Sequence, residues 1–195
     1  MTLDLLDRAG DVSVYVDNYE RPLYYLLDKQ MKAYYIFQQA DEATISDILD
    51  WMRNRERAIY RAAVRELGAL KKLRPQYIQQ KPLQEQFLFL KKMLSWKPSE
   101  EIGDHLLQVW LLRKHESMLV DFLNTLGIEH NGHGVVDVLP DTLDQEKLQK
   151  AVDQLFEKYP AGVASVYLQM FQLQTEDGWD ELADVLANDP RVTIR

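Results

Sequence analysis

Apolar residues recur every three or four positions along most of the chain, which is the spacing of a buried face on an α-helix. The pattern predicts helices over residues 22–39, 44–73, 83–96, 99–126, 144–159, 161–174 and 179–187, and a weaker signal favours a short helix over 2–9. We therefore expect an all-α fold, a compact bundle of six or seven helices in a single domain over residues 1–195.

Local signals place the ends of several of these helices. Thr44, with Asp47 three residues later, is a typical N-cap for the helix over 44–73. Pro98 interrupts the apolar pattern, and Gly127 stands where a left-handed residue closes a helix. The pattern misses one step at Glu56, although we expect one long helix there.

Residues 128–138 are the main exception to the helical spacing. Asn131-Gly132 is a strong signal for a two-residue turn, flanked by the short strands 128–130 and 133–135, so a small β-hairpin is expected. In such a hairpin His130 and His133 face each other, with Cβ atoms about 4.5–5.5 Å apart. Two imidazoles at that separation can hold zinc, nickel or copper, with Asp137 as a nearby carboxylate. The alternative is an exposed polar turn that binds nothing.

Glu101 and His105 form a second candidate pair, one helical turn apart. The helical projection places His105 among Val109, Leu112 and Leu123, so we expect it in apolar surroundings. There the pair could act as acid and base or as two metal ligands. The alternative is a core histidine with one hydrogen-bond partner. We assign no role to His115.

Most enzyme signatures are missing from the sequence. The chain has no cysteine, which excludes disulfides, thiolate metal sites and cysteine nucleophiles. No glutamate is followed by a histidine three residues later, as di-iron bundles require. There is also no phosphate-binding Gly-rich loop, no His-Glu-x-x-His and no Gly-x-Ser-x-Gly. We expect no cofactor and no covalent catalytic machinery.

Charge is unevenly distributed along a chain whose formal net charge is −8. Residues 1–52 hold 4 basic and 10 acidic side chains. Residues 53–97 hold 12 basic and 3 acidic side chains, and residues 98–195 hold 7 basic and 18 acidic side chains. A basic centre between acidic flanks can bind an external polyanion. It can also face the acidic parts of the chain itself, within a monomer or across a dimer.

Four arginines of the basic segment follow one another at four-residue steps: Arg53, Arg57, Arg61 and Arg65. On one continuous helix these steps drift by only about 40° each, so the four guanidinium groups would share one flank. That flank could dock an acidic helix of a partner subunit, track nucleic-acid phosphates, or simply be solvated. The acidity of the whole chain and the lack of a short polar recognition helix weigh against nucleic acid.

Six of the ten tyrosines fall between residues 15 and 35, and four of them form the adjacent pairs Tyr24–Tyr25 and Tyr34–Tyr35. Adjacent helical residues differ by about 100° in direction, so the rings cover more than one side of the helix. Tyrosine is enriched at protein interfaces. The pairs therefore indicate a homodimer or partner-binding face, and the alternative is that they line the edge of the core.

No stretch of the sequence indicates a signal peptide or a membrane span. Asp4 and Asp7 precede the first basic residue, which is the reverse of a signal peptide. The uncharged run over residues 160–175 is shorter than the roughly 20 residues of a spanning helix. We expect a soluble cytoplasmic protein that does not act at a membrane.

The sequence is best interpreted as an α-helical interaction protein that forms a homo-oligomer, such as a dimer, or binds a protein partner. The expected surface combines two groups of residues: Tyr24, Tyr25, Tyr34 and Tyr35 with Arg53, Arg57, Arg61 and Arg65. One alternative is a metal-binding protein or metal-dependent enzyme that uses His130, His133 and Asp137, or Glu101 and His105. Another is nucleic-acid binding through the basic segment 53–97.

Overall fold

Ten α-helices and one short 3₁₀ helix form the regular structure of residues 32–175 and 178–195, the part of the chain that the computed structural model describes. The all-α prediction is confirmed, whereas six or seven helices is too low a count. In chain order the elements are α1 (Ala33–Gln39), α2 (Glu42–Arg55), α3 (Arg57–Leu70), α4 (Pro75–Gln79), α5 (Leu83–Leu94), η1 (Lys97–Ser99), α6 (Glu100–Lys114), α7 (Glu116–Leu126), α8 (Gln145–Lys158), α9 (Ala161–Gln172) and α10 (Asp180–Asn188).

Two predicted long helices are each divided by one non-helical residue. Glu56, with φ −117° and ψ 52°, ends α2 and precedes α3, so the prediction of one continuous helix over 44–73 is wrong. Its carboxylate pairs with the Arg113 guanidinium at 2.8 Å. His115, with φ −113° and ψ 24°, separates α6 from α7 in the same way. Neither position is proline or glycine, so tertiary contacts rather than local propensity turn the chain here.

The other predicted boundaries are confirmed in part. Gly127 closes α7 in the left-handed conformation, with φ 75°, as expected. The N-cap of α2 is Asp41 rather than Thr44, because the Asp41 carboxylate accepts a hydrogen bond from the Thr44 backbone N–H at 2.6 Å.

The hairpin expected at 128–138 is absent, because the described part of the chain contains no strand. These residues form a compact loop instead. The Asn131 side chain accepts hydrogen bonds from the backbone N–H groups of His133 and Val135, at 2.9 and 3.3 Å. An Asn side chain that satisfies its own turn in this way competes with a strand ladder.

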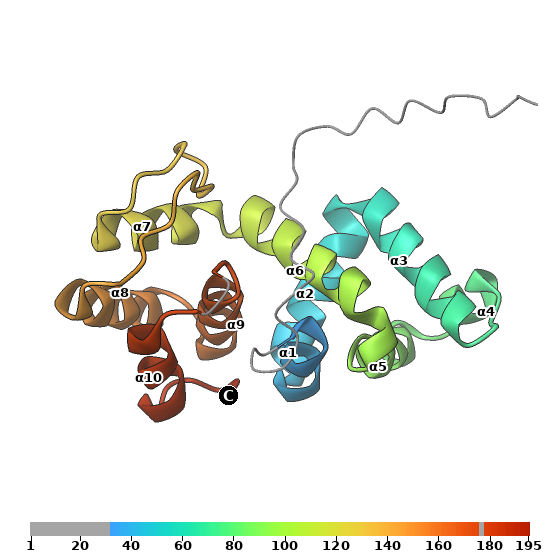
Figure 1. Ribbon diagram of the computed structural model, residues 1–195. Coiled ribbons are helices and arrows are strands. Elements are labelled where there is room, and N and C mark those ends of the chain that lie inside the picture. The colour runs from blue at the N-terminus through green and yellow to red at the C-terminus, as the bar shows by residue number, and fades with distance from the viewer. Residues whose placement is uncertain (1–31, 176–177) are drawn as a thin grey trace, which may run out of the picture.

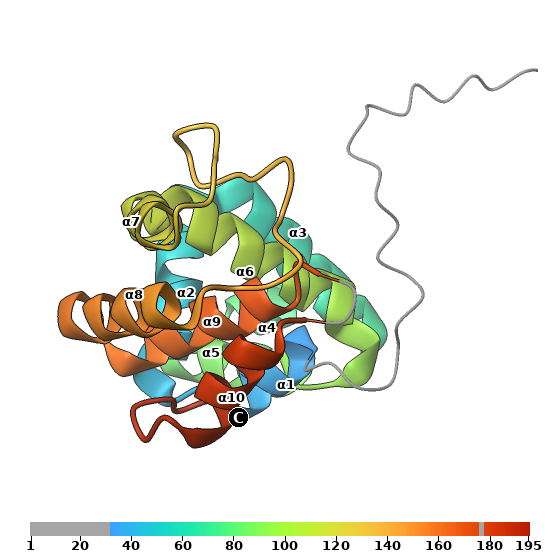
Figure 2. The same ribbon diagram turned by 60° about the vertical axis from the view of Figure 1, so that its left-hand side comes forward.

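α6 crosses the centre of the molecule between two groups of helices (Figure 1). α2 to α5 lie on one side of α6, and α7 to α10 lie on the other, in front in the turned view of Figure 2. α9 runs through the core, where every residue from Gly162 to Phe171 is buried. Trp110 of α6 and Trp179, which precedes α10, are among the largest fully buried side chains.

α1 joins the two groups of helices. Both carboxylate oxygens of Glu100 accept hydrogen bonds at its N-terminus, from the Ala33 and Tyr34 backbone N–H groups at 2.9 and 3.0 Å. At its other end the Gln39 side chain accepts a hydrogen bond from the backbone N–H of Arg195 at 2.7 Å. α1 also packs against α5, α6 and α9.

Several expectations lie outside the described residues. These are the short helix over 2–9, the first part of the helix over 22–39, and Tyr24 and Tyr25. Among the helices that are described, none combines the length and the apolar character that crossing a membrane requires.

Candidate functional site

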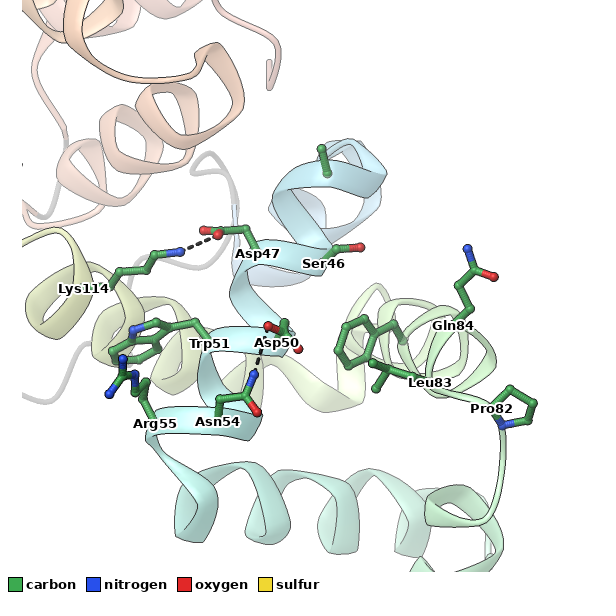
Figure 3. Close-up of a pocket in the computed structure, with 12 residues that line it drawn as sticks. Ser46, Asp47, Asp50, Trp51, Asn54, Arg55, Pro82, Leu83, Gln84 and Lys114 are labelled. Carbon is green, nitrogen blue, oxygen red and sulfur yellow. Dashed lines mark hydrogen bonds and ion pairs between the residues drawn. The ribbon is translucent and has the colours of Figure 1, made fainter.

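An open cleft of about 1090 Å³ lies between α2 and α5 (Figure 3). Lys114, the last residue of α6, closes one end. Apolar side chains and a polar row meet in it. Its lining includes Ser46, Asp47, Asp50, Trp51, Asn54 and Arg55 of α2 with Leu83, Gln84 and Phe87 of α5.

Helical spacing accounts for this lining. Ser46, Asp50 and Asn54 recur every four residues along α2 and form the polar row on the cleft side. The positions between them, including Ile48 and Leu49, are buried in the core. On α5 a single turn brings Leu83 and Phe87 to the same side, which gives the opposite wall its apolar character.

The cleft contains charges of both signs, and some of them are paired. The Lys114 ammonium forms an ion pair with Asp47 (Figure 3). Asp50 accepts a hydrogen bond from the Asn54 amide at 3.0 Å and lies 4.0 Å from the Arg53 guanidinium. The cleft is therefore electrostatically mixed, and it suits an amphipathic segment better than a highly charged ligand.

His115 lies behind the Lys114 end of the cleft and has the most perturbed histidine environment in the described chain. Its side chain is 13% exposed, and its ring meets Trp110 edge-on at 4.5 Å. Burial lowers the pKa of His115 to about 4, helped by the neighbouring Lys114 cation and opposed by Asp47. Its Nε2 atom has no hydrogen-bond partner and lies 4.0 Å from an Asp47 oxygen.

This environment makes His115 a neutral packing residue at physiological pH. A separation of 4.0 Å is too long for a hydrogen bond, so the Asp47 carboxylate does not orient the ring as it would in a catalytic dyad. The sequence alone indicates no role for His115. The apolar residues on both sides of it along the chain, such as Leu111 and Leu119, were the available signal of a buried ring.

The arginine line is divided between two helices. Arg53 belongs to α2, whereas Arg57, Arg61 and Arg65 are exposed at four-residue steps on α3. The Arg53 and Arg65 guanidinium groups approach Asp50 and Glu66 at 4.0 and 3.8 Å. Arg57 and Arg61 form no ion pair with any residue of the described ranges. Arg57, Arg61 and Arg65 therefore share one flank of α3, as expected, whereas Arg53 belongs to a different helix.

Large apolar side chains are exposed in the same part of the molecule. Tyr77 is 55% exposed and Leu88 is 56% exposed, and Lys71 lies over the exposed Trp96 ring at 4.3 Å. Arginine, tyrosine and tryptophan are the residues that protein interfaces favour. We call residues 57–96, which form α3, α4, α5 and their connections, the basic half.

Of the four tyrosines of the expected surface, the two within the described residues, Tyr34 and Tyr35, lie on α1. The Tyr34 and Tyr35 rings are 4.3 Å apart, and Tyr35 is 42% exposed. The hydrogen bond with the Tyr35 side chain, together with burial, raises the pKa of Tyr34 to about 12. α1 packs mainly on α5, α6 and α9, whereas α3 packs mainly on α2, α4 and α5. The tyrosine pair and the arginine flank thus share α5 as a neighbour, while their other neighbours differ.

The two candidate metal histidines engage separate partners. His130 Nε2 lies 3.2 Å from the Asn124 side-chain oxygen, and His133 Nδ1 lies 2.8 Å from a Glu116 carboxylate oxygen. Without the hairpin, nothing holds the two rings face to face. Asp137 is exposed. Across residues 32–175 and 178–195, no three His, Asp or Glu side chains are grouped closely enough to hold a metal ion.

Glu101 and His105 are both exposed, so the expectation of an apolar environment for His105 is wrong. They line an open groove of about 450 Å³ between α6 and α3. The small side chains Ala58 and Ala62 form the α3 wall of this groove. The side of α6 that carries Glu101 and His105 therefore faces a shallow surface rather than the core.

Comparison with protein-family models, with curated proteins and with solved structures finds no match to this chain. Its function is therefore inferred from the side chains described above.

Proposed function

We propose that this chain is an interaction protein whose basic half binds an acidic protein surface, and that this surface is the acidic part of a second copy. The product would be a homodimer. The observation that carries the proposal is the pair of exposed arginines on α3, Arg57 and Arg61, which have no ion pair among the described residues.

Exposed apolar side chains elsewhere in the basic half support an interface rather than a solvated face. Leu70, Tyr77 and Leu83 are each more than a third exposed. Apolar contact area and unpaired cations together provide both the affinity and the selectivity that a protein interface needs.

The opposite end of the molecule offers the complementary charge. Asp180 and Asp184 lie one turn apart on α10, are exposed, and form no ion pair in the described part of the chain. α3 and α10 lie at opposite ends of the molecule (Figures 1 and 2). Two copies related by a twofold axis could therefore place the basic half of each against the acidic end of the other.

The mass of the chain in solution, measured by light scattering over a concentration series, tests the proposal. We expect a dimer whose dissociation constant rises roughly 30- to 1,000-fold in the double variant Arg57→Glu plus Arg61→Glu, if each reversed charge contributes about 0.5–1 kcal/mol in each copy. Lys150→Glu on α8 is the control, because Lys150 is exposed and unpaired among the described residues, and its reversal changes the charge as much as either single arginine reversal does.

A second charge reversal identifies the acidic side. The double variant Asp180→Lys plus Asp184→Lys should by itself weaken self-association. A chain that carries both the aspartate and the arginine reversals should self-associate again. A strict monomer at high concentration would refute the self-association. Retardation of nucleic acid that falls steeply with added salt would instead support the alternative of a phosphate-binding surface.

A further inference from the structure

A second, more enclosed cavity of about 330 Å³ lies between α6, α7 and α9. Aliphatic side chains of α6 and α7 line it, together with Met170 and Phe171 of α9. The loop after α7 covers it with Val135, Val136 and Leu139. This volume is at the lower end of the range for small-molecule sites.

Four contacts hold the loop over this cavity. His130 contacts Asn124 and His133 contacts Glu116, so each histidine fastens the loop to α7. The buried Trp179 indole donates a hydrogen bond to the Pro140 carbonyl at 2.9 Å. The fourth contact is the close approach of Gly134 to α7.

Gly134 has the backbone conformation and the lack of a side chain that this approach requires. Its φ is 78°, and a Cβ added to it would lie 2.8 Å from the Leu119 Cβ. Only glycine fits there without displacing the loop. His130 and His133, which suggested a metal site, thus hold the loop that covers the cavity against α7.

Three polar residues line the cavity, and none of its lining residues is charged. The Tyr167 hydroxyl forms no hydrogen bond among the described residues. One amide N–H of Gln108 donates to Asp104 at 2.7 Å, and one amide N–H of Gln174 donates to the Met170 carbonyl at 3.2 Å. The lining therefore carries one hydroxyl group, two amide oxygens that can accept a hydrogen bond, and one further N–H on each amide.

We propose that this cavity binds a neutral, largely apolar small molecule that ends in one hydroxyl group. At about 30 Å³ per non-hydrogen atom, the volume that a water occupies in the liquid, the cavity holds about ten such atoms. The ligand hydroxyl would accept a hydrogen bond from Tyr167 and donate one to a glutamine oxygen. A carboxylate is excluded as the buried end because no cation lines the cavity to offset its desolvation.

Calorimetric titration of the full chain with octanol, and separately with octanoate, tests the proposal. We expect saturable binding of one octanol per chain, and at least tenfold weaker binding of octanoate. Tyr167→Phe should weaken octanol binding about three- to tenfold, the effect of losing one hydrogen bond.

A bulky substitution at the cavity mouth provides the second test. Leu112 lines the cavity and is 37% exposed, so Leu112→Trp should fill the entrance without disrupting the core, and should abolish binding. Val138→Trp is the matched control, because Val138 lies on the same loop, is 82% exposed and does not line the cavity. Absence of saturable octanol binding, equal affinity for octanoate, or unchanged binding by Leu112→Trp would each overturn the proposal.

Discussion

Replacement of His115 by glutamine should flatten the dependence of stability on pH. In the folded chain the pKa of this imidazole is lowered from 6.5 to about 4, chiefly because burial disfavours its charged form. The unfolded chain therefore takes up a proton at a pH where the folded chain does not. The stability due to this group is fully present above about pH 6.5 and is lost as the pH falls towards about 4.

The size of the effect follows from the shift. One pKa unit corresponds to about 1.4 kcal/mol, so the whole shift corresponds to about 3 kcal/mol at most. The side chain keeps 13% of its surface exposed, and solvent screening reduces the expected contribution to about 2 kcal/mol. Between about pH 7 and about pH 5, His115 should cost the wild type about 1–2 kcal/mol of unfolding free energy.

Denaturant unfolding at the two pH values measures this difference. His115→Gln should lose about 1–2 kcal/mol less than the wild type over the interval, whatever its stability at neutral pH. His105→Gln is the matched control, because it makes the same substitution at an exposed position of α6. Parallel curves for His115→Gln and the wild type would refute the assignment of a buried neutral imidazole.

Three further predictions concern close contacts in the fold. Gly134→Ala should weaken octanol binding at least fivefold, because the added Cβ lifts the loop from Leu119. Gly132 has φ 87° but open space where a Cβ would lie, so Gly132→Ala should lower the unfolding free energy by only about 1–2 kcal/mol and leave octanol binding intact. Glu100→Ala should lower the unfolding free energy by about 1–2 kcal/mol, because two N–H groups of α1 lose their acceptor. Gly162→Ala should destabilise by about 1–3 kcal/mol through overlap with the Thr44 hydroxyl, and Thr44→Ala in the same chain should restore most of that loss, as thermal unfolding will show.

Apolar spacing predicts where the helices lie, and local residues such as proline and glycine predict where several of them begin or end. α5 begins after Pro82, α9 follows Pro160, and α7 ends at Gly127, as each of these residues indicates. Such signals act within a few residues, so the sequence alone reveals them.

The breaks at Glu56 and His115 could not be predicted, because their causes lie far away in the chain. Glu56 meets Arg113 of α6, and His115 packs on Trp110 and faces Asp47 of α2. A helix-compatible residue is held outside the helical region there by tertiary contacts that outweigh its weak local preference.

The candidate sites show the same limit. The exposed arginines of α3 could be predicted, since four-residue spacing on one helix is a local property. The two cavities could not, because each joins walls that are remote in sequence, such as α2 and α5 around one and α6, α7 and α9 around the other.

The long-range contacts of α1 have a consequence for the order in which the chain folds during synthesis. α1 is capped by Glu100, 66 and 67 positions after the backbone groups that it binds, and Gln39 meets Arg195 after 156 positions. At about 5–20 residues per second, a ribosome needs about 10–30 s to deliver that last contact. Until then Ile36 and Phe37, fully buried in the finished fold, are not yet covered by α9 and the C-terminal residues.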